Sequence, residues 1–298
     1  IGMIYESRPN VTVDASILAL KSGNSVLLKG GSDAINSNRA IVQAIKRGLK
    51  MVGLPGGCVE LIEDISRDCV MEMLKMREYL SLIIPRGGSG LIQFVVNNST
   101  VPVIETGTGN CHIFVDYNAD LRKAVSIVDN AKTQRPGTCN AVETVLVHEK
   151  IAGEFLPMMK ETLSRKNVEL RGCEKSRQFV EMVPATEEDY ETEFLDLILA
   201  VKVVNDVKEA VEHIERYSSH HSESILTQDY SNARYFLKAV DSAAVYVNAS
   251  TRFTDGGEFG FGSEIGISTQ KLHARGPFGL RELTSYKYTV MGDYQVRE

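Results

Sequence analysis

Residues 198–247 read ILAVKVVNDVKEAVEHIERYSSHHSESILTQDYSNARYFLKAVDSAAVYV, and this stretch decides the fold class. Short apolar runs, typical of buried strands, alternate in it with segments whose apolar residues recur at the period of a helix. We predict strands over 198–204, 224–227 and 243–247, separated by helices over 207–217 and 231–239. Strands that alternate with helices build parallel sheets, so the sequence predicts an α/β protein.

The same alternation runs through the first half of the chain. We predict strands over 25–29, 80–84, 101–104, 112–115 and 141–148, and helices over 37–50, from 86–90 onward, and over 120–132. Ser37 is the expected N-cap of the first of these helices, because a serine side chain accepts hydrogen bonds from free backbone N–H groups.

The length of 298 residues predicts two domains with parallel-rich sheets. The string Thr-Gly-Thr-Gly-Asn at 106–110 interrupts the alternation and marks a boundary. We expect a first domain over 1–107, a second over 108–275, and a C-terminal segment over 276–298. Residues 286–290 alternate weakly and would form a strand that pairs with another subunit. The chain begins at Ile1 rather than Met, so we expect a preceding segment to be missing.

Composition argues against several classes of protein. The net charge is -6 without a basic stripe, which disfavours nucleic-acid binding. The longest apolar runs are too short to span a bilayer. The five cysteines are odd in number and unevenly spaced, and no Cys or His spacing typical of a metal site occurs. We therefore expect a cytoplasmic enzyme, with no disulfide framework and no structural metal.

Cys139 is the first candidate for chemistry. It lies in the string QRPGTCN at 134–140, where Pro136 and Gly137 end the preceding helix and form a tight turn. A thiol on such a turn is presented rather than packed, and Arg135 or nearby N–H groups could lower its pKa. From these residues alone, Cys139 is either a nucleophile or an ordinary structural cysteine.

Two further residues could assist a nucleophile. Glu105 lies 34 residues before Cys139, which leaves room for one strand and one helix, so the two could meet across the domain boundary. It would act there as a general base, or else it caps backbone N–H groups. Asn10 follows Pro9, and its amide could donate to an oxyanion, or else it only forms a turn.

Three residues that follow predicted strands could contact phosphate. Lys29 ends a strand, and its side chain could reach a phosphate or a ribose hydroxyl. Gly88 and Ser89 precede a predicted helix, whose free N–H groups favour an anion. Neither loop is a dinucleotide fingerprint or a P-loop, so ordinary turns explain both equally well.

Seven strings appear together in one order along nearly the whole chain. They are YESRPNVT (5–12), LLKGGSDAINSN (27–38), LIIPRGGSGLI (82–92), ETGTGNCH (105–112), TQRPGTCNAVET (133–144), VNASTRF (247–253) and EIGISTQKLHARGPFGL (264–280). With these strings the chain resembles the gamma-glutamyl phosphate reductases, a family within the aldehyde dehydrogenase superfamily. The resemblance implies two α/β domains, one for NADPH and one for the thiol, with the active site between them.

The resemblance also implies roles for individual residues. Cys139 matches the family nucleophile and Asn10 the oxyanion-hole asparagine. Glu105 matches a general base of hydrolytic relatives, a role that a reductase need not use. The positions that match cofactor contacts are Lys29, Gly88, Ser89 and Glu193. The positions that would anchor the far end of the substrate are Ser250, Thr251, Arg252, His273 and Arg275, although loop capping or surface solvation would explain these five as well.

The implied activity is reduction of L-glutamyl 5-phosphate by NADPH to L-glutamate 5-semialdehyde, through a cysteine thioester. This reaction belongs to proline biosynthesis, and the resemblance also implies a homo-oligomer and a functional association with glutamate 5-kinase. Two other interpretations stay open. The chain could be a different aldehyde dehydrogenase relative that oxidises an aldehyde with NAD, or an inactive binding partner of the kinase.

Overall fold

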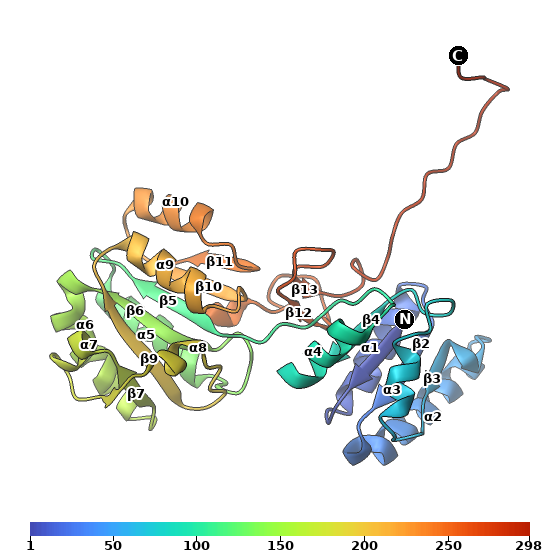
Figure 1. The fold of residues 1–298 in the computed structure, drawn as a ribbon, viewed down its shortest axis with the longest axis horizontal. Coiled ribbons are helices and arrows are strands. Elements are labelled where there is room, and N and C mark those ends of the chain that lie inside the picture. The colour runs from blue at the N-terminus through green and yellow to red at the C-terminus, as the bar shows by residue number, and fades with distance from the viewer.

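Four parallel strands form the smaller sheet of the computed structural model, which describes residues 1–298 (Figure 1). Their order is β3-β2-β1-β4, so the chain builds outward on one side of β1 and then places β4 on the other. The strands are β1 (Gly2–Tyr5), β2 (Val26–Gly30), β3 (Val59–Leu61) and β4 (Ile83–Arg86). The helices are α1 (Asn10–Lys21), η1 (Ser32–Ala34), α2 (Ile35–Met51), η2 (Gly56–Cys58), α3 (Asp68–Met73) and α4 (Ser89–Asn98).

Seven strands form the larger sheet, all parallel, in the order β11-β10-β5-β6-β9-β7-β8. They are β5 (Cys111–Val115), β6 (Val142–His148), β7 (Glu169–Gly172), β8 (Val183–Pro184), β9 (Ile198–Val204), β10 (Ser222–Leu226) and β11 (Ala244–Val247). The helices are α5 (Leu121–Thr133), α6 (Glu149–Ser164), α7 (Glu174–Arg177), α8 (Glu187–Glu191), α9 (Val207–Tyr217) and α10 (Tyr230–Ala239).

The central strands of this sheet are buried on both faces. Along β5, Ile113 and Val115 belong to one apolar core with residues of α5 and α6, whereas Phe114 belongs to another with residues of α9 and α10. Successive side chains of a strand point to opposite faces, so helices must cover both sides. This explains the continuous apolar runs in the sequence and confirms the predicted α/β class.

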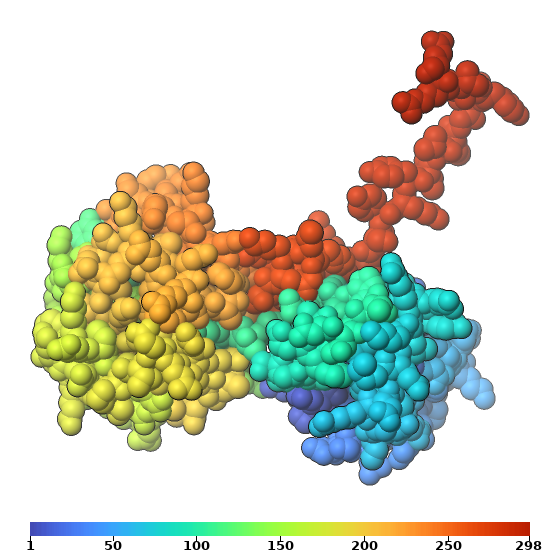
Figure 2. Space-filling view, in the orientation of Figure 1, coloured from blue at the N-terminus to red at the C-terminus, as the bar shows by residue number.

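After β11 the chain first packs against the second lobe and then returns to the first lobe. The segment contains η3 (Thr251–Phe253) and a small antiparallel pair, β12 (Gly266–Ser268) and β13 (Gly276–Phe278). Ile265 and Phe278 pack in the same core as Met3 of β1. Residues 265–278 therefore complete the core of the first lobe. The predicted second domain over 108–275 assigned most of these residues to the other lobe. In Figure 2 this red segment joins the two bodies.

The last residues extend away from the body as an arm (Figure 1). Residues 285–298 are exposed throughout, and residues 286–290 form no strand within this chain. Their pairing with another subunit stays a prediction. None of the helices is long and apolar enough to cross a membrane.

Some local predictions are corrected by the structure. Residues 101–104 form no strand, because only a single bridge joins Val103 to Ile83. The helix predicted over 37–50 is α2, which begins at Ile35 with Ala34 as N-cap. Ser37 therefore lies inside the helix and caps nothing. The 3-10 turn of η1 leads directly into α2 and moves its start forward.

Candidate active site

The carboxyl ends of the strands in the smaller sheet form one edge, as parallel pairing requires. Tyr5 at the end of β1 pairs with Gly30 of β2 and with Arg86 of β4. The strand order reverses between β1 and β4, and such switch points are where open α/β sheets bind ligands. Lys29 lies at this edge but is buried, and its ammonium donates to the carbonyl oxygen of Gly30 at 3.3 Å.

The loop with Gly88 and Ser89, which we predicted to contact the cofactor, lies at this switch point. Gly88 is the N-cap of α4, and no side chain caps the helix. The Gly88 N–H donates to a carboxylate oxygen of Glu6 at 2.9 Å, and a Cβ at Gly87 would lie only 2.5 Å from that oxygen. A helix N-terminus lined by glycines fits a phosphate group. The loop therefore suits a dinucleotide, provided that the Glu6 side chain moves aside.

Cys139 lies on the loop between α5 and β6, where residues 109–111 pack against it. A Cβ at Gly109 would lie 1.4 Å from the Cys139 carbonyl oxygen, so only glycine allows the two backbones to approach this closely. The Cys111 thiol donates to the same oxygen at 3.1 Å. The segment that joins the two lobes thus fixes the backbone of the candidate nucleophile.

Burial dominates the electrostatics of Cys139 and raises the pKa of its thiol to about 11. The positive charge of Arg86 opposes this shift, while the carboxylates of Glu193 and Glu264 reinforce it. The sequence pointed to Arg135 as the cation that lowers the thiol pKa, but the structure gives that effect chiefly to Arg86, which comes from the other lobe. Charged groups from both lobes therefore act on the thiol.

Glu193 lies close to the same loop. One of its carboxylate oxygens accepts a hydrogen bond from the Gly109 N–H at 2.7 Å. Burial raises the pKa of Glu193, and the Gly109 N–H and Lys132 oppose that shift. Glu193 is thus brought beside Cys139, although they are far apart in sequence.

The segment 250–252 packs directly on the Cys139 loop. Thr251 donates from its hydroxyl to the backbone oxygen of Asn140 at 2.7 Å, and Ser250 caps η3. The Arg252 guanidinium donates to the side chains of Gln134, Thr138 and Asn140. These three residues therefore border the site, although the contacts of Arg252 hold the loop together rather than leave the guanidinium free.

The other candidates are less tightly tied to Cys139. Asn10 begins α1 on the exposed surface, and its amide donates to Asp14 at 3.1 Å rather than to the Cys139 loop. The backbone N–H of Glu105 is held by Gln270 at 2.6 Å, and its carboxylate makes no hydrogen bond or ion pair. The roles of Asn10 and Glu105 stay predictions.

His273 and Arg275 lie on the returning segment. His273 is exposed, and Arg275 forms an ion pair with Asp241 at 2.8 Å and donates to its backbone oxygen. Asp241 precedes β11, so this contact ties the returning segment to the second lobe. A substrate-anchoring role for either residue stays a prediction.

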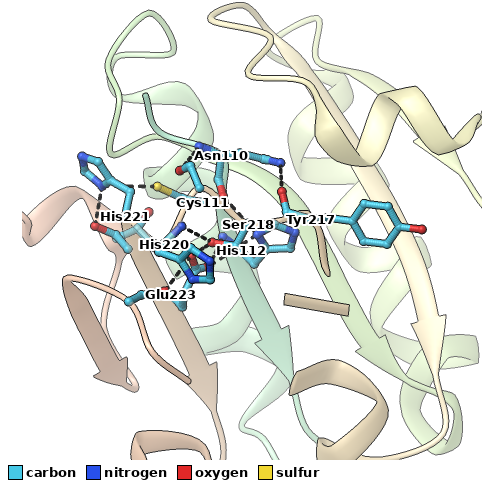
Figure 3. A network of polar contacts seen from close by, with 12 residues as sticks. Asn110, Cys111, His112, Tyr217, Ser218, His220, His221 and Glu223 are labelled. Atoms are coloured by element: carbon cyan, nitrogen blue, oxygen red, sulfur yellow. Dashed lines mark hydrogen bonds and ion pairs between the residues drawn. The ribbon is translucent and has the colours of Figure 1, made fainter. Parts of the chain in front are cut away.

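A buried polar network follows Gly109 and supports the base of the site (Figure 3). The amide of Asn110 donates to the backbone oxygen of Tyr217 at 2.7 Å, and the His112 N–H donates to Glu223 at 2.6 Å. Burial lowers the pKa of His221 to about 4, so this histidine is neutral near pH 7. These hydrogen bonds tie residues 110–112 to α9 and β10, while the Oδ1 of Asn110 and the Nε2 atoms of His112 and His221 have no hydrogen-bond partner.

Sequence reasoning missed three residues that the structure places beside Cys139. Gly109 and Arg86 lie within strings that were singled out, but for other residues. Arg86 ends β4 at the same edge as Lys29, and a basic residue that directly precedes Gly-Gly could have identified it. Glu264 is the first residue of the last of these strings, but nothing local links it to the thiol, because it reaches the site only through the return of the chain to the first lobe.

Comparison with known proteins identifies the family of this chain. The aldehyde dehydrogenase family model matches residues 9–188. The gamma-glutamyl phosphate reductase of Thermotoga petrophila is 68% identical over 299 residues, which span all of this chain and 72% of that relative. A crystal structure of the Thermotoga maritima enzyme of that name has a TM-score of 0.98 at 67% identity, over 100% of this chain and 72% of that one. This chain belongs to the gamma-glutamyl phosphate reductases, within the aldehyde dehydrogenase family.

Membership confirms the resemblance drawn from the seven strings and the aldehyde dehydrogenase-like fold. It makes the chain an oxidoreductase of proline biosynthesis. A propionaldehyde dehydrogenase of Rhodopseudomonas palustris, crystallised with CoA, shares the fold at 18% identity, with a TM-score of 0.72 over 95% of this chain and 72% of that one. An engineered glycolyl-CoA reductase with bound NADP+ has the same identity and TM-score, over 95% and 73%.

Proposed function

We propose that this chain reduces L-glutamyl 5-phosphate to L-glutamate 5-semialdehyde and phosphate, with NADPH as the reductant and Cys139 as a covalent nucleophile. The observation that carries the proposal is the placement of Cys139. Its backbone is fixed by Gly109 and Cys111, and charged groups of both lobes act on its thiol. Family membership supplies the substrate class.

In the first step the Cys139 sulfur attacks the acyl carbon of the substrate. The C–S bond forms, the bond from that carbon to the phosphate oxygen breaks, and the thiol proton passes to the departing phosphate or to water. Because burial keeps the free thiol protonated near neutral pH, the Arg86 charge is needed to favour the thiolate. The Cys139 N–H and the Asn10 amide would stabilise the oxyanion.

The residues that would hold the cofactor are Lys29, Gly88, Ser89 and Glu193. The uncapped start of α4 suits the pyrophosphate, and Glu193 suits a ribose hydroxyl beside the thiol. When bound, NADPH supplies the hydride that reduces the thioester carbonyl. The C–S bond then breaks, the aldehyde leaves, and Cys139 returns to its starting state.

Ser250, Thr251 and Arg252 border the far side of the Cys139 loop and would contact the amino-acid end of the substrate. His273 and Arg275 lie farther along the returning segment and are weaker candidates, because Arg275 is already paired with Asp241. Glu105 has no required step, since a reductase must keep water away from the thioester rather than activate it.

We also propose a reducing, cytoplasmic setting and a homo-oligomer. All five cysteines are free, which suits a reducing compartment. The extended arm carries exposed apolar and aromatic side chains such as Tyr288 and Met291, which suit burial in a subunit contact. Acyl phosphates hydrolyse in water, so a functional association with the glutamate 5-kinase that makes the substrate would protect it.

The test compares the purified protein with Cys139→Ser, using Cys58→Ser as a matched control. The readout is phosphate-dependent oxidation of the semialdehyde with NADP+, the reverse of the proposed reaction. We expect a loss of at least about a thousandfold for Cys139→Ser and little change for the control. Full activity of Cys139→Ser would contradict the thioester. Oxidation to the free acid without phosphate, or only with NAD+, would instead identify an ordinary aldehyde dehydrogenase.

A further inference from the structure

We propose that Arg86 binds the phosphoryl group of the acyl phosphate and, in the reverse direction, inorganic phosphate. Arg86 would then set the specificity for an acyl phosphate. The inference rests on the proposed function, because it names the residue that receives the leaving group of that reaction.

The first argument is the position of the side chain. Arg86 is the last residue of β4, so it lies at the carboxyl edge of the smaller sheet, at the switch point between β1 and β4. Its guanidinium lies against the backbone of β12. A Cβ at Gly266 would be 2.9 Å from the Arg86 Nη1 and 2.6 Å from the Thr106 methyl carbon. The absence of a side chain at Gly266 therefore leaves room for the guanidinium.

The second argument is that the guanidinium has no partner. Arg252 donates to three side chains and Arg275 pairs with Asp241, whereas the Arg86 guanidinium makes no hydrogen bond and no ion pair within the chain. Its side chain is half-buried, and this burial is the main cause that lowers its pKa. A guanidinium carries five N–H donors, and no group of this chain accepts from those of Arg86. This arrangement suits a residue that receives an anion from outside the chain.

The third argument is the neighbourhood. Among the charged groups near Arg86, the Cys139 thiol exerts the largest effect that favours the protonated guanidinium. The remaining neighbours are Arg8, Glu264 and Asp14, so one further cation and two carboxylates also border this space. Arg86 thus lies close enough to the Cys139 thiol for its charge to act on an anion bonded to the carbon under attack.

The chemistry of the reaction selects phosphate as that anion. The phosphate is one bond from the acyl carbon that Cys139 attacks, whereas the substrate carboxylate is separated from that carbon by the rest of the side chain. A guanidinium matches phosphate with two parallel hydrogen bonds, which a lysine cannot reproduce. The nearest rival ligand is the cofactor pyrophosphate, because Gly88 is only two residues away, and the test must separate the two.

The kinetic test uses Arg86→Gln and Arg86→Lys, with Arg122→Gln as a control that removes an exposed guanidinium from α5. The reverse reaction is measured while inorganic phosphate, semialdehyde and NADP+ are varied in turn. For Arg86→Gln we expect the KM for phosphate to rise about ten- to a hundredfold, with the KM for NADP+ changed less than about threefold. Arg86→Lys should recover part of the loss, since it keeps the charge without the planar fork.

A binding test uses the protein without cofactor and needs no turnover. Inorganic phosphate alone should slow alkylation of Cys139 by iodoacetamide, and the phosphate concentration for half protection should rise in Arg86→Gln. This concentration is compared rather than the alkylation rate itself, because removal of the Arg86 charge also changes the reactivity of the thiol.

The outcomes separate the competing explanations. A raised KM for NADP+ with an unchanged KM for phosphate would assign Arg86 to the cofactor and overturn the proposal. Equal changes in all three constants would make Arg86 a structural residue, and no change in any of them would also overturn it. If the unsubstituted protein lacks phosphate-dependent oxidation, the proposed function fails, and the alkylation test then decides the inference on its own.

Discussion

Replacing Gly109 with alanine should displace the candidate nucleophile. The added methyl group would lie 1.4 Å from the Cys139 carbonyl oxygen and 2.6 Å from its Cα. Non-bonded heavy atoms rest about 3.5 Å apart, so one backbone must retreat by about 2 Å. Gly109 is held by Glu193, and Asn110 is held by two backbone carbonyls, so the Cys139 loop is the part that moves.

The magnitude follows from this displacement. A misplacement of about 1 Å in a reacting group costs about a hundredfold in rate, so we expect kcat to fall at least that far. Overpacking should also cost about 1–3 kcal/mol of the free energy of unfolding. Gly48→Ala is the matched control. A Cβ at Gly48 meets open space in the middle of α2, so the free energy of unfolding should rise by about 0.5–1 kcal/mol.

The assay pairs kcat of the phosphate-dependent oxidation with urea unfolding of each variant. The expected pattern for Gly109→Ala is a folded protein with a large loss of kcat, whereas Gly48→Ala keeps full activity. If Gly109→Ala keeps kcat within about threefold while it remains folded, the contact with Gly109 does not position Cys139 and the reasoning is refuted.

Two further predictions concern the Glu105 carboxylate and the buried His221 imidazole. Glu105→Gln should keep phosphate-dependent activity within a few-fold, because the structure ties down its backbone N–H and not its carboxylate; a hundredfold loss of kcat would restore a general-base role. The free energy of unfolding should fall as the pH drops from about 6.5 to 4, because burial lowers the pKa of His221 to about 4 and the unfolded chain takes up the proton first. This one group contributes about 3 kcal/mol across that window. Urea unfolding at several pH values should show a shallower slope for His221→Gln, and an unchanged slope would contradict the assignment.

The sequence predicted much of the larger sheet, because its strands and helices follow local periodicity. The helix α9 has the predicted bounds, and the strands over 198–204 and 142–148 agree within one residue. The prediction of a strand over 101–104 failed because this segment is buried without forming a β-ladder. Its apolar side chains, including Val101 and Ile104, pack in the cores, but only a single bridge joins it to β4. Periodicity reports burial, and it cannot distinguish a buried connecting segment from a strand.

The site was harder to predict than the fold because it is made of contacts between distant residues. Cys139 could be found from its turn, but its neighbours Arg86, Glu193 and Glu264 come from three other parts of the chain. The return of residues 265–278 to the first lobe has no local signature. The family strings include Arg86 and Glu264 but not Glu193, and they did not say which residues within them meet the thiol.

The balance of effects at Cys139 suggests why an unpaired arginine is placed there. With a pKa of about 11, about one thiol in ten thousand is ionised at pH 7, so burial outweighs the attraction of Arg86 in the free protein. During the proposed reaction, negative charge passes from sulfur to the carbonyl oxygen and then to the departing phosphate. A cation that is fixed beside this path, and bound to nothing else in the chain, can favour each state without reorganising. An arginine already paired with a carboxylate, as Arg275 is with Asp241, would lose that advantage.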